Sequence, residues 1–246
     1  MSRWSIYIDV EGFSEIYRLR QGRAIQTLGE LMEALFLIAS KKFPAAPERL
    51  FIHQFGDGFV VVSDFMEPNP QRPIAICIAV MRHLISRGVA TKAAISGGDF
   101  SDKSSGYPET VLAASRDRRH VNIGEGVMTI IPVMGMALIA PYNLAKRRRG
   151  AVLLLDSTIF VSLPIGIIAK PGSPAVIDWV HSDSPLVAEV AKTAELITPD
   201  ASDTEAHLRS YIDNNRSTLG ADWVSATLDS VGMTISSLGH IGTSRE

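Results

Sequence analysis

The chain has little cysteine and little net charge. Its one cysteine, Cys77, cannot form an intrachain disulfide, and the formal net charge is −2 over 246 residues. A chain without disulfides fits a reducing compartment, so we expect a cytoplasmic protein. Dedicated nucleic-acid-binding proteins usually carry a basic excess, which this sequence lacks. We therefore expect no nucleic-acid partner.

Long apolar runs are also missing. The longest weakly polar stretch, residues 127–140, is interrupted by Pro132 and Gly135. It is shorter than the roughly 20 residues that a membrane-spanning helix needs, and the N-terminus lacks the pattern of a signal peptide. We predict a soluble protein with no membrane partner. Apolar residues still make up 46% of the chain, enough for a substantial core in which we expect Cys77 to be buried.

The spacing of apolar residues predicts alternating strands and helices over the first 160 residues. The predicted strands cover residues 3–10, two halves of a hairpin within 49–65, 90–96, 127–131 and 151–156, and the predicted helices cover 23–42, 74–86, about 110–115 and 136–146. The order β-α-β-β-α-β is the split βαβ arrangement. We predict an α+β fold, a ferredoxin-like palm in which helices cover one face of a mixed sheet.

The character of the sequence changes after about residue 180. We predict a helix over 185–197 and a longer apolar stripe over 203–232, which Gly220 interrupts. We assign residues 1–180 to one domain and residues 181–246 to a C-terminal helical extension. The extension can pack on its own domain, or it can serve as a dimerising or partner-binding arm, and the sequence leaves both readings open.

Two short acidic motifs are the most informative feature of the chain. They read Asp9-Val10-Glu11-Gly12-Phe13 and Phe55-Gly56-Asp57-Gly58-Phe59, and each follows an apolar run that predicts a strand. The Gly-Asp-Gly step predicts a tight hairpin turn. Carboxylates that end neighbouring strands can converge, and such hard oxygen ligands suit Mg²⁺ or Mn²⁺ in phosphate chemistry. The motifs therefore predict a metal site for phosphoryl or nucleotidyl transfer, although either Asp alone would more simply be a strand-end carboxylate.

The two motifs together resemble class III nucleotidyl cyclases over residues 3–160. Those dimeric palm-like domains convert a nucleoside triphosphate into a 3′,5′-cyclic monophosphate and pyrophosphate. A third segment, Gly135 to Leu144, reads G-M-A-L-I-A-P-Y-N-L. It is similar to the pattern G-x-A-L-x-x-A-Y-x-L of a divergent bacterial branch. That branch resembles the pyrimidine cyclases of the Pycsar anti-phage systems, which make cyclic UMP or cyclic CMP.

The resemblance implies two Mn²⁺ or Mg²⁺ ions per site. Asp9 and Asp57 would be the catalytic carboxylates that hold both ions, and the backbone carbonyl of Val10 would be a further ligand. One ion would lower the pKa of the attacking 3′-hydroxyl, and the other would neutralise charge on the triphosphate. Backbone N–H groups at the start of the next helix would bind the β- and γ-phosphates. The residues of this turn are Glu11, Gly12 and Phe13.

The chain departs from the adenylate-specific members of that family at the base-reading positions. Those members have a Lys four residues before the second metal Asp, where this chain has His53. Their base-reading Asp falls at about Pro132. The Asn and Arg that they use for ribose and transition-state contacts fall at Ile139 and Asn143 in an ungapped alignment, and Asn143 remains a candidate substrate contact. These departures argue against ATP, and the resemblance to the divergent branch favours UTP over CTP. His53 is either a base contact or an ordinary core or interface histidine.

The family arginine that contacts the α-phosphate is also missing, so another cation must take its place. Lys146, in the run Lys146-Arg147-Arg148-Arg149, is one candidate, and Lys92 on the predicted strand 90–96 is another. The simpler interpretation of the run is a solvated helix end, where positive charge is favourable. The basic stretch 116–120 is more simply a solvated loop than a nucleic-acid patch.

The resemblance implies a homodimer with its sites at the interface, metals from one subunit and base contacts from the other. The cyclic product would act on a separate cyclic-nucleotide effector in anti-phage defence. The implied function is a uridylate or, less favoured, cytidylate cyclase, which is a lyase. One alternative is a catalytically inactive cyclase-like binding or dimerisation domain. Another is a purine cyclase; diguanylate cyclases have a Gly-Gly-Asp/Glu-Glu-Phe hairpin, from which Phe55–Phe59 differs.

Overall fold

A computed structural model of the protein describes residues 2–42, 50–63, 70–103, 106–115, 117, 119–159 and 163–234. The described strands of the main sheet are β1 (Ser2–Val10), β2 (Leu50–Phe55), β3 (Gly58–Ser63), β4 (Thr91–Asp99), β9 (Leu153–Leu155), β10 (Ala169–Lys170) and β11 (Ala175–Ile177). They lie in the order β10-β11-β9-β4-β1-β3-β2. The helices next to this sheet are α1 (Phe13–Leu19), α2 (Gln21–Lys42), α3 (Gln71–Ser86) and α5 (Met136–Ala145).

The segment β4-β1-β3-β2 is the predicted ferredoxin-like palm. Its strands are antiparallel throughout, because β1 pairs with both β3 and β4, and β2 pairs with β3. Helix α2 connects β1 to β2, and α3 connects β3 to β4, which is the split βαβ arrangement. The α+β prediction is therefore confirmed. Strand β9 then adds to β4 in parallel, and β11 and β10 extend the sheet beyond it.

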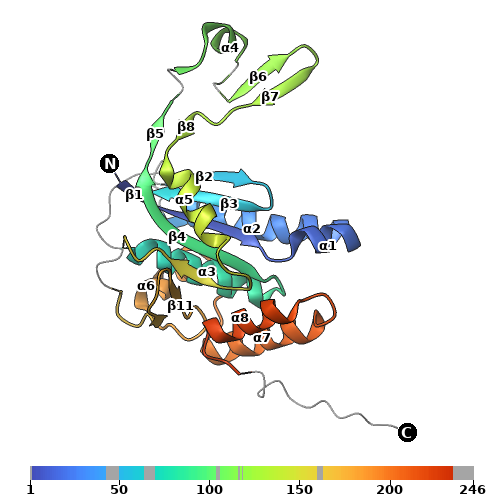
Figure 1. Ribbon diagram of the computed structural model, residues 1–246, viewed down its shortest axis with the longest axis vertical. Helices are drawn as coiled ribbons and strands as arrows, with labels where there is room; N and C mark the ends of the chain where they lie inside the picture. The colour runs from blue at the N-terminus through green and yellow to red at the C-terminus, as the bar shows by residue number, and fades with distance from the viewer. Residues whose placement is uncertain are drawn as a thin grey trace.

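Helices cover both faces of the sheet (Figure 1), whereas the sequence predicted helices on one face. Side chains alternate between faces along a strand. On β1, Ile6 and Ile8 pack in a core with α2 and α3, whereas Tyr7 packs in a second core with α5. The prediction was wrong because β1 carries buried residues on both faces, and the second apolar face is closed by α5.

Helix α3 is buried on every side, as its apolar composition predicts. All its residues from Pro73 to Ile85 are buried, and Cys77 has no exposed surface. Burial raises the pKa of the Cys77 thiol above its ordinary value, so this cysteine is a core residue. Within the described ranges, no helix has both the length and the apolarity to span a bilayer.

The third sequence motif begins where the chain folds back against β4. Gly135 precedes α5 with φ 139°, and a Cβ atom there would lie 2.1 Å from the backbone oxygen of Asp99. The Asp99 side chain accepts a hydrogen bond from the N–H of Met136 at 3.0 Å. The glycine is therefore required for the close approach that sets α5 on the sheet.

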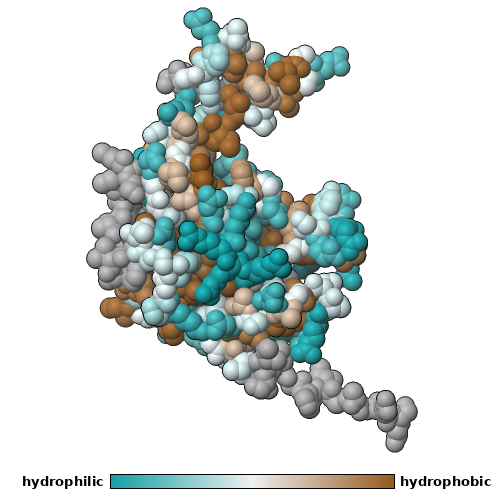
Figure 2. Space-filling view, in the orientation of Figure 1, coloured by the Kyte–Doolittle hydropathy of each residue, from teal (hydrophilic) through white to brown (hydrophobic). Residues whose placement is uncertain are grey.

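A projecting arm lies between β4 and α5 (Figure 1). Its elements are β5 (Ser101–Asp102), α4 (Glu109–Ala114), β6 (His120–Ile123), β7 (Gly126–Thr129) and β8 (Val133–Met134). Helix α4 confirms the predicted helix at 110–115. The predicted strand 127–131 corresponds to β7, which pairs with β6 outside the main sheet. Figure 2 shows apolar side chains gathered on this arm, where Ile123 and Val127 are each 58% exposed.

The C-terminal helices pack on the palm. They are α6 (Pro185–Ala194), α7 (Ala201–Asn214) and α8 (Ala221–Ser230), and α6 contacts both α2 and α3. Leu208 and Leu228 lie in the same core as the α2 and α3 side chains. This favours packing on the chain's own domain over a free arm, while the boundary at residue 180 stays a prediction. The sequence also predicts frayed ends for residues 241–246, which lie outside the described residues.

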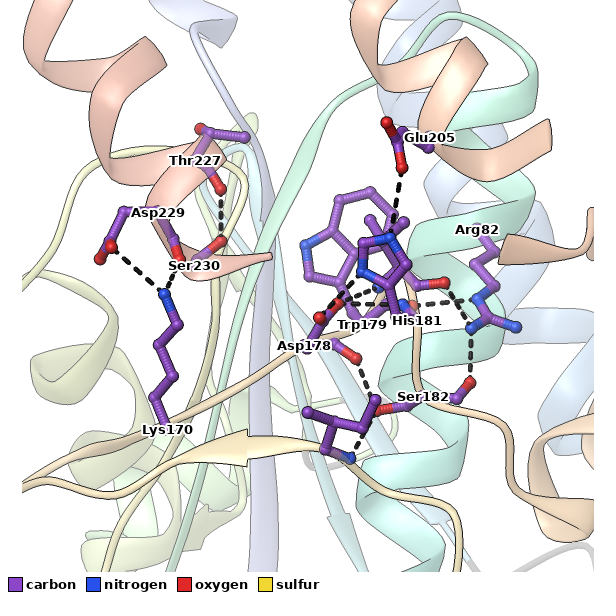
Figure 3. A network of polar contacts seen from close by, with 12 residues as sticks. Arg82, Lys170, Asp178, Trp179, His181, Ser182, Glu205, Thr227, Asp229 and Ser230 are labelled. Atoms are coloured by element: carbon purple, nitrogen blue, oxygen red, sulfur yellow. Dashed lines mark hydrogen bonds and ion pairs between the residues drawn. The ribbon is translucent and has the colours of Figure 1, made fainter. Parts of the chain in front are cut away.

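A network of buried polar contacts holds this region in place (Figure 3). Arg82 of α3 donates hydrogen bonds to the carbonyls of Trp179 at 3.0 Å, Val180 at 2.8 Å and Ser182 at 2.5 Å. His181 lies next to them and contacts carboxylates on both sides of its ring. The chain entering α6 is therefore fixed to α3 by side-chain contacts as well as by apolar packing.

Candidate functional site

The two acidic motifs meet at one end of the sheet, as predicted. Asp9 lies near the end of β1, opposite Gly58 of β3 and Lys92 of β4. Asp57 lies in the turn between β2 and β3, and its carbonyl accepts a hydrogen bond from the N–H of Val10 at 3.4 Å. The backbones of the two motifs are thus in direct contact. The negative charge of Asp57 also contributes to the raised pKa of Asp9.

Asp9 is a buried acid with an unsatisfied oxygen. Its Oδ1 atom is buried and has no hydrogen-bond partner among the described residues. Burial is the main cause that raises the pKa of Asp9 to about 7, and the charges of Glu11 and Asp57 add to it, while Lys92 opposes it. A carboxylate oxygen in this state needs a proton or a cation. The site therefore favours either a proton on Asp9 or a positively charged ligand beside it.

The second glycine of the hairpin lets the two strands approach this closely. A Cβ atom on Gly58 would lie 2.8 Å from the Cβ of Asp9, from the carbonyl oxygen of Ile8 and from the hydroxyl of Tyr7. Any other residue at position 58 would push the hairpin away from β1. The Gly-Asp-Gly motif is thus explained by close packing against Asp9 as well as by its turn.

The donor set fits a hard divalent cation that shares its ligands with a substrate. Mg²⁺ is usually held by one or two carboxylates together with waters and substrate phosphates. Asp9 supplies an unpaired oxygen, and Asp57 lies beside it on the hairpin. The described residues place no group of three or more His, Cys, Asp or Glu side chains together for a metal ion. A cation here would therefore need further oxygen ligands, such as the Val10 carbonyl, waters or a bound phosphate group.

Glu11 differs from its predicted role. Its N–H donates to the carbonyl of Ala90 at 2.9 Å, so it is not free for a phosphate. Its carboxylate is buried, with Lys92 Nζ at 2.5 Å and a hydrogen bond from Trp223 Nε1 at 2.5 Å. Sequence reasoning missed Trp223, which comes from α8. Glu11 therefore links the palm to the C-terminal helices and holds Lys92 next to Asp9.

The remaining residues of the turn keep the predicted geometry. Helix α1 begins at Phe13, and Gly12 precedes it with φ 73°. The carbonyl of Gly12 accepts from the N–H groups of Glu15 at 3.1 Å and Ile16 at 3.0 Å. The N–H groups of Gly12 and Phe13 have no hydrogen-bond partner within the described part of the chain. Together with the N–H of Ser14, which also lacks a partner there, they remain available to an anion.

Aromatic residues connect α5 to the carboxylates. The Tyr142 ring lies 5.2 Å from that of Tyr7 and 5.3 Å from that of Phe55, both edge to face. Lys146 Nζ lies 4.0 Å from the centre of the Tyr142 ring. Burial, followed by the charges of Asp9 and Asp57, raises the pKa of Tyr7 above its ordinary value. Lys146 therefore approaches the site through Tyr142, which the sequence contained within its third motif but did not single out.

Among the described residues, neither His53 nor Asn143 makes a hydrogen bond or ion pair with Asp9 or Asp57. His53 lies on edge strand β2, and its ring stacks with Phe51 at 6.3 Å between centres. Burial lowers the pKa of His53 below its ordinary value. Asn143 is exposed and makes no hydrogen bond or ion pair with another described residue. Pro132 lies in the arm, where its carbonyl accepts from the N–H of Lys103 at 2.8 Å.

Comparisons with known proteins return cyclase domains at low similarity. No family model matches the sequence, and no curated protein matches it. The guanylyl cyclase Cya2 is 12% identical, with 75% of this chain and 94% of that chain covered at a TM-score of 0.39. A bacterial light-regulated adenylyl cyclase is 10% identical, with 79% of this chain and 56% of that chain covered at a TM-score of 0.44. The guanylyl cyclase domain of the RhoGC fusion protein from the aquatic fungus Blastocladiella emersonii is 10% identical. The match covers 72% of this chain and 92% of that chain at a TM-score of 0.42. At such values we draw the function from this chain's own residues.

Proposed function

We propose that the protein is a pyrimidine nucleotide cyclase that converts UTP, and less readily CTP, into the 3′,5′-cyclic monophosphate and pyrophosphate. The observation that carries this proposal is the buried, unpaired Oδ1 of Asp9 beside the Asp57 hairpin. The two acidic motifs and the segment 135–144 support it by their resemblance to cyclases. The resemblance to the divergent branch alone favours a pyrimidine base.

In this proposal Asp9, Asp57 and the carbonyl of Val10 hold two Mg²⁺ or Mn²⁺ ions. When bound, such ions activate the 3′-hydroxyl and neutralise the triphosphate. The free N–H groups of Gly12 and Phe13 bind phosphate oxygens at the start of α1. Lys92 lies opposite Asp9 in the sheet and gives a positive charge to the same place. These groups keep the α-phosphate fixed while the hydroxyl attacks it and pyrophosphate leaves.

The base and the ribose then need contacts from elsewhere. Within the described residues His53 stacks on Phe51, and Asn143 makes no hydrogen bond or ion pair, so neither is engaged at the carboxylates. We propose that a second subunit of a homodimer supplies base contacts, with His53 and Asn143 facing the site from across the interface. Lys146 completes the charge around the phosphates. The cyclic product is read by a separate effector in phage defence, in the cytoplasm.

The test is a substrate comparison. The purified protein is incubated with UTP, CTP, ATP or GTP and Mn²⁺, and cyclic products are resolved by mass spectrometry. We expect cyclic UMP as the main product and cyclic CMP second. Cyclic AMP or cyclic GMP as the main product would refute the pyrimidine assignment. No cyclic product from any of the four would refute the cyclase.

A further inference from the structure

A second cavity lies behind the turn that follows Asp9. It measures about 310 Å³ and is enclosed by the start of α1 and α2 on one side and by α7 with the loop to α8 on the other. Its lining includes Gly12, Ile16, Arg20, Tyr211 and Thr218. Small-molecule sites have volumes from about 300 Å³ upward and occur preferentially where structural units meet. This cavity has both properties, since α7 and α8 belong to the C-terminal helices.

The cavity is on the other face of β1 from the carboxylates. Val10 lines it, together with Thr27 of α2 and Val89, which precedes β4. Residue 10 points to the α2 and α3 face, whereas residue 9 points to the α5 face, because neighbours alternate along a strand. Asp9 and Asp57 are not among the residues that line the cavity. A molecule bound here would therefore lie away from the two carboxylates, although it would share the Gly12 turn with the triphosphate of the proposed function.

Several polar groups in the lining, those of Tyr211 and Arg20 among them, have no partner within the described ranges. Tyr211 is 9% exposed, and its hydroxyl makes no hydrogen bond there. Burial, with the charge of Glu11, raises the pKa of Tyr211 to about 12, so the hydroxyl remains a donor at neutral pH. Arg20 is exposed, and its guanidinium makes no ion pair or hydrogen bond with the described residues. An unpaired phenol at the wall of a cavity is satisfied by water or by a ligand.

The other charged groups of the lining are already engaged. Glu11 is paired with Lys92 at 2.5 Å, and Glu15 is paired with Arg18 at 2.6 Å. Arg23 donates to the carbonyls of Arg87 and Gly88 at 3.3 Å each. The free charge that remains in the cavity is therefore the positive charge of Arg20. Such a site favours an oxyanion, which a guanidinium can bind through two parallel hydrogen bonds.

We propose that this cavity is a binding site for a small molecule carrying a phosphate or carboxylate group, held by Arg20 and by the hydroxyl of Tyr211. Glu11 and Gly12 also line the cavity, so its occupant contacts the turn that follows Asp9. Binding itself does not depend on the proposed cyclase activity. Any influence on turnover does, and it would act through the position of that turn.

The experiment measures binding without substrate or metal. UMP, pyrophosphate and succinate are titrated separately in EDTA, and binding is followed by thermal shift and by tryptophan fluorescence, because the Trp223 ring lies 6.0 Å from that of Tyr211. We expect at least one probe to bind. Tyr211→Phe and Arg20→Ala should each weaken that binding by about 10-fold or more, as expected for a hydrogen bond to a charged group. Arg119→Ala, an exposed arginine on the arm, is the matched control and should bind normally.

Asp57→Asn separates this site from the metal site. The variant should bind the probe as tightly as the wild-type protein, whatever its turnover. Loss of probe binding in Asp57→Asn would overturn the proposal, because the probe would then occupy the substrate site. It would also be overturned if no probe bound, or if both cavity variants bound as tightly as wild type. None of these results alters the four-nucleotide assay, so the two proposals can fail separately.

Discussion

The contacts of the C-terminal helices and the end of β1 differ in how their buried polar groups are paired. Where the C-terminal helices meet the palm, Arg82 of α3 donates to three carbonyls, and the indole N–H of Trp223 donates to a carboxylate. At the end of β1, Asp9 keeps a buried oxygen without a partner in the described structure. A buried group with partners stabilises the fold, whereas one without them costs free energy.

This difference suggests which region is built for a ligand. Asp9 lies within a well-packed sheet, between Gly58 and Lys92, so its unpaired oxygen is not explained by loose packing. Strain of this kind is concentrated at functional sites. The C-terminal contacts, in contrast, explain how α6–α8 are held against the palm. Experiments that alter one region at a time can break or sharpen this distinction.

The largest effect is expected for Asp57→Asn. Loss of the charge should reduce cyclic nucleotide formation by more than about 100-fold, since even an outer partner of a metal ligand can be worth 10- to 100-fold. The turn should survive, because the bond from Val10 N–H uses the backbone carbonyl of residue 57. Steady-state rates and circular dichroism measure the two properties. Asp117→Asn, on the exposed arm, is the matched control. Full activity in Asp57→Asn would refute the metal role.

Asp9→Asn should remove activity and yet gain stability at high pH. The pKa of Asp9 rises from its ordinary 3.8 to about 7 on folding, so the folded state binds the proton more tightly. The charged form of Asp9 therefore lowers the free energy of unfolding of the wild-type protein. This loss is absent below about pH 4 and complete above pH 7, where it amounts to roughly 2 to 4 kcal/mol. In EDTA, the melting temperature of the variant relative to wild type should increase between pH 4 and pH 8. A constant difference would contradict the buried-charge interpretation.

Trp223→Phe tests the hydrogen bond that joins α8 to Glu11. The ring that packs against Tyr211 is retained, but the hydrogen bond to the Glu11 carboxylate is lost. Hydrogen bonds to charged groups contribute about 1.5 to 3 kcal/mol, so the free energy of unfolding should fall by that amount. Trp179→Phe is the matched control, because its indole N–H donates to the neutral carbonyl of Ala151 at 2.8 Å. Equal losses in both variants would remove the special role of Glu11.

Much of the palm and the position of its carboxylates could be predicted because the signals are local. Alternation along β1, the Gly-Asp-Gly turn and the helical spacing of α2 and α3 each lie within one element. Once the split βαβ order is recognised, Asp9 and Asp57 must come to the same end of the sheet. The prediction needed no knowledge of side-chain contacts.

The surroundings of the carboxylates could not be predicted because they come from distant parts of the chain. Glu11 and Trp223 are separated by 212 positions, and no local pattern connects them. The hydrogen bond from the Glu11 N–H to the Ala90 carbonyl depends on the register of β1 against β4. The placement of α5 on the second face likewise depends on Gly135 folding back on Asp99. Each is a tertiary contact that overrides a local expectation.

The smallest effect concerns His181, whose Nδ1 lies 2.9 Å from Asp178 and whose Nε2 lies 3.3 Å from Glu205 (Figure 3). Burial by itself would lower the pKa of His181, but the hydrogen bonds and charges of Asp178 and Glu205 outweigh it and raise the pKa. A raised pKa means that protonated His181 stabilises the folded state. This stabilisation is complete below pH 6.5 and is lost as the pH rises through the pKa that His181 has in the folded protein. Because the ring is partly exposed, the contribution should stay below about 1 kcal/mol. The melting temperature of wild type relative to His181→Gln should therefore decrease slightly between pH 5.5 and pH 8.5. An increase over that range would show that the two carboxylates do not hold a protonated imidazole, and the contrast with Asp9, whose carboxylate lacks a hydrogen-bonded cation, would be lost.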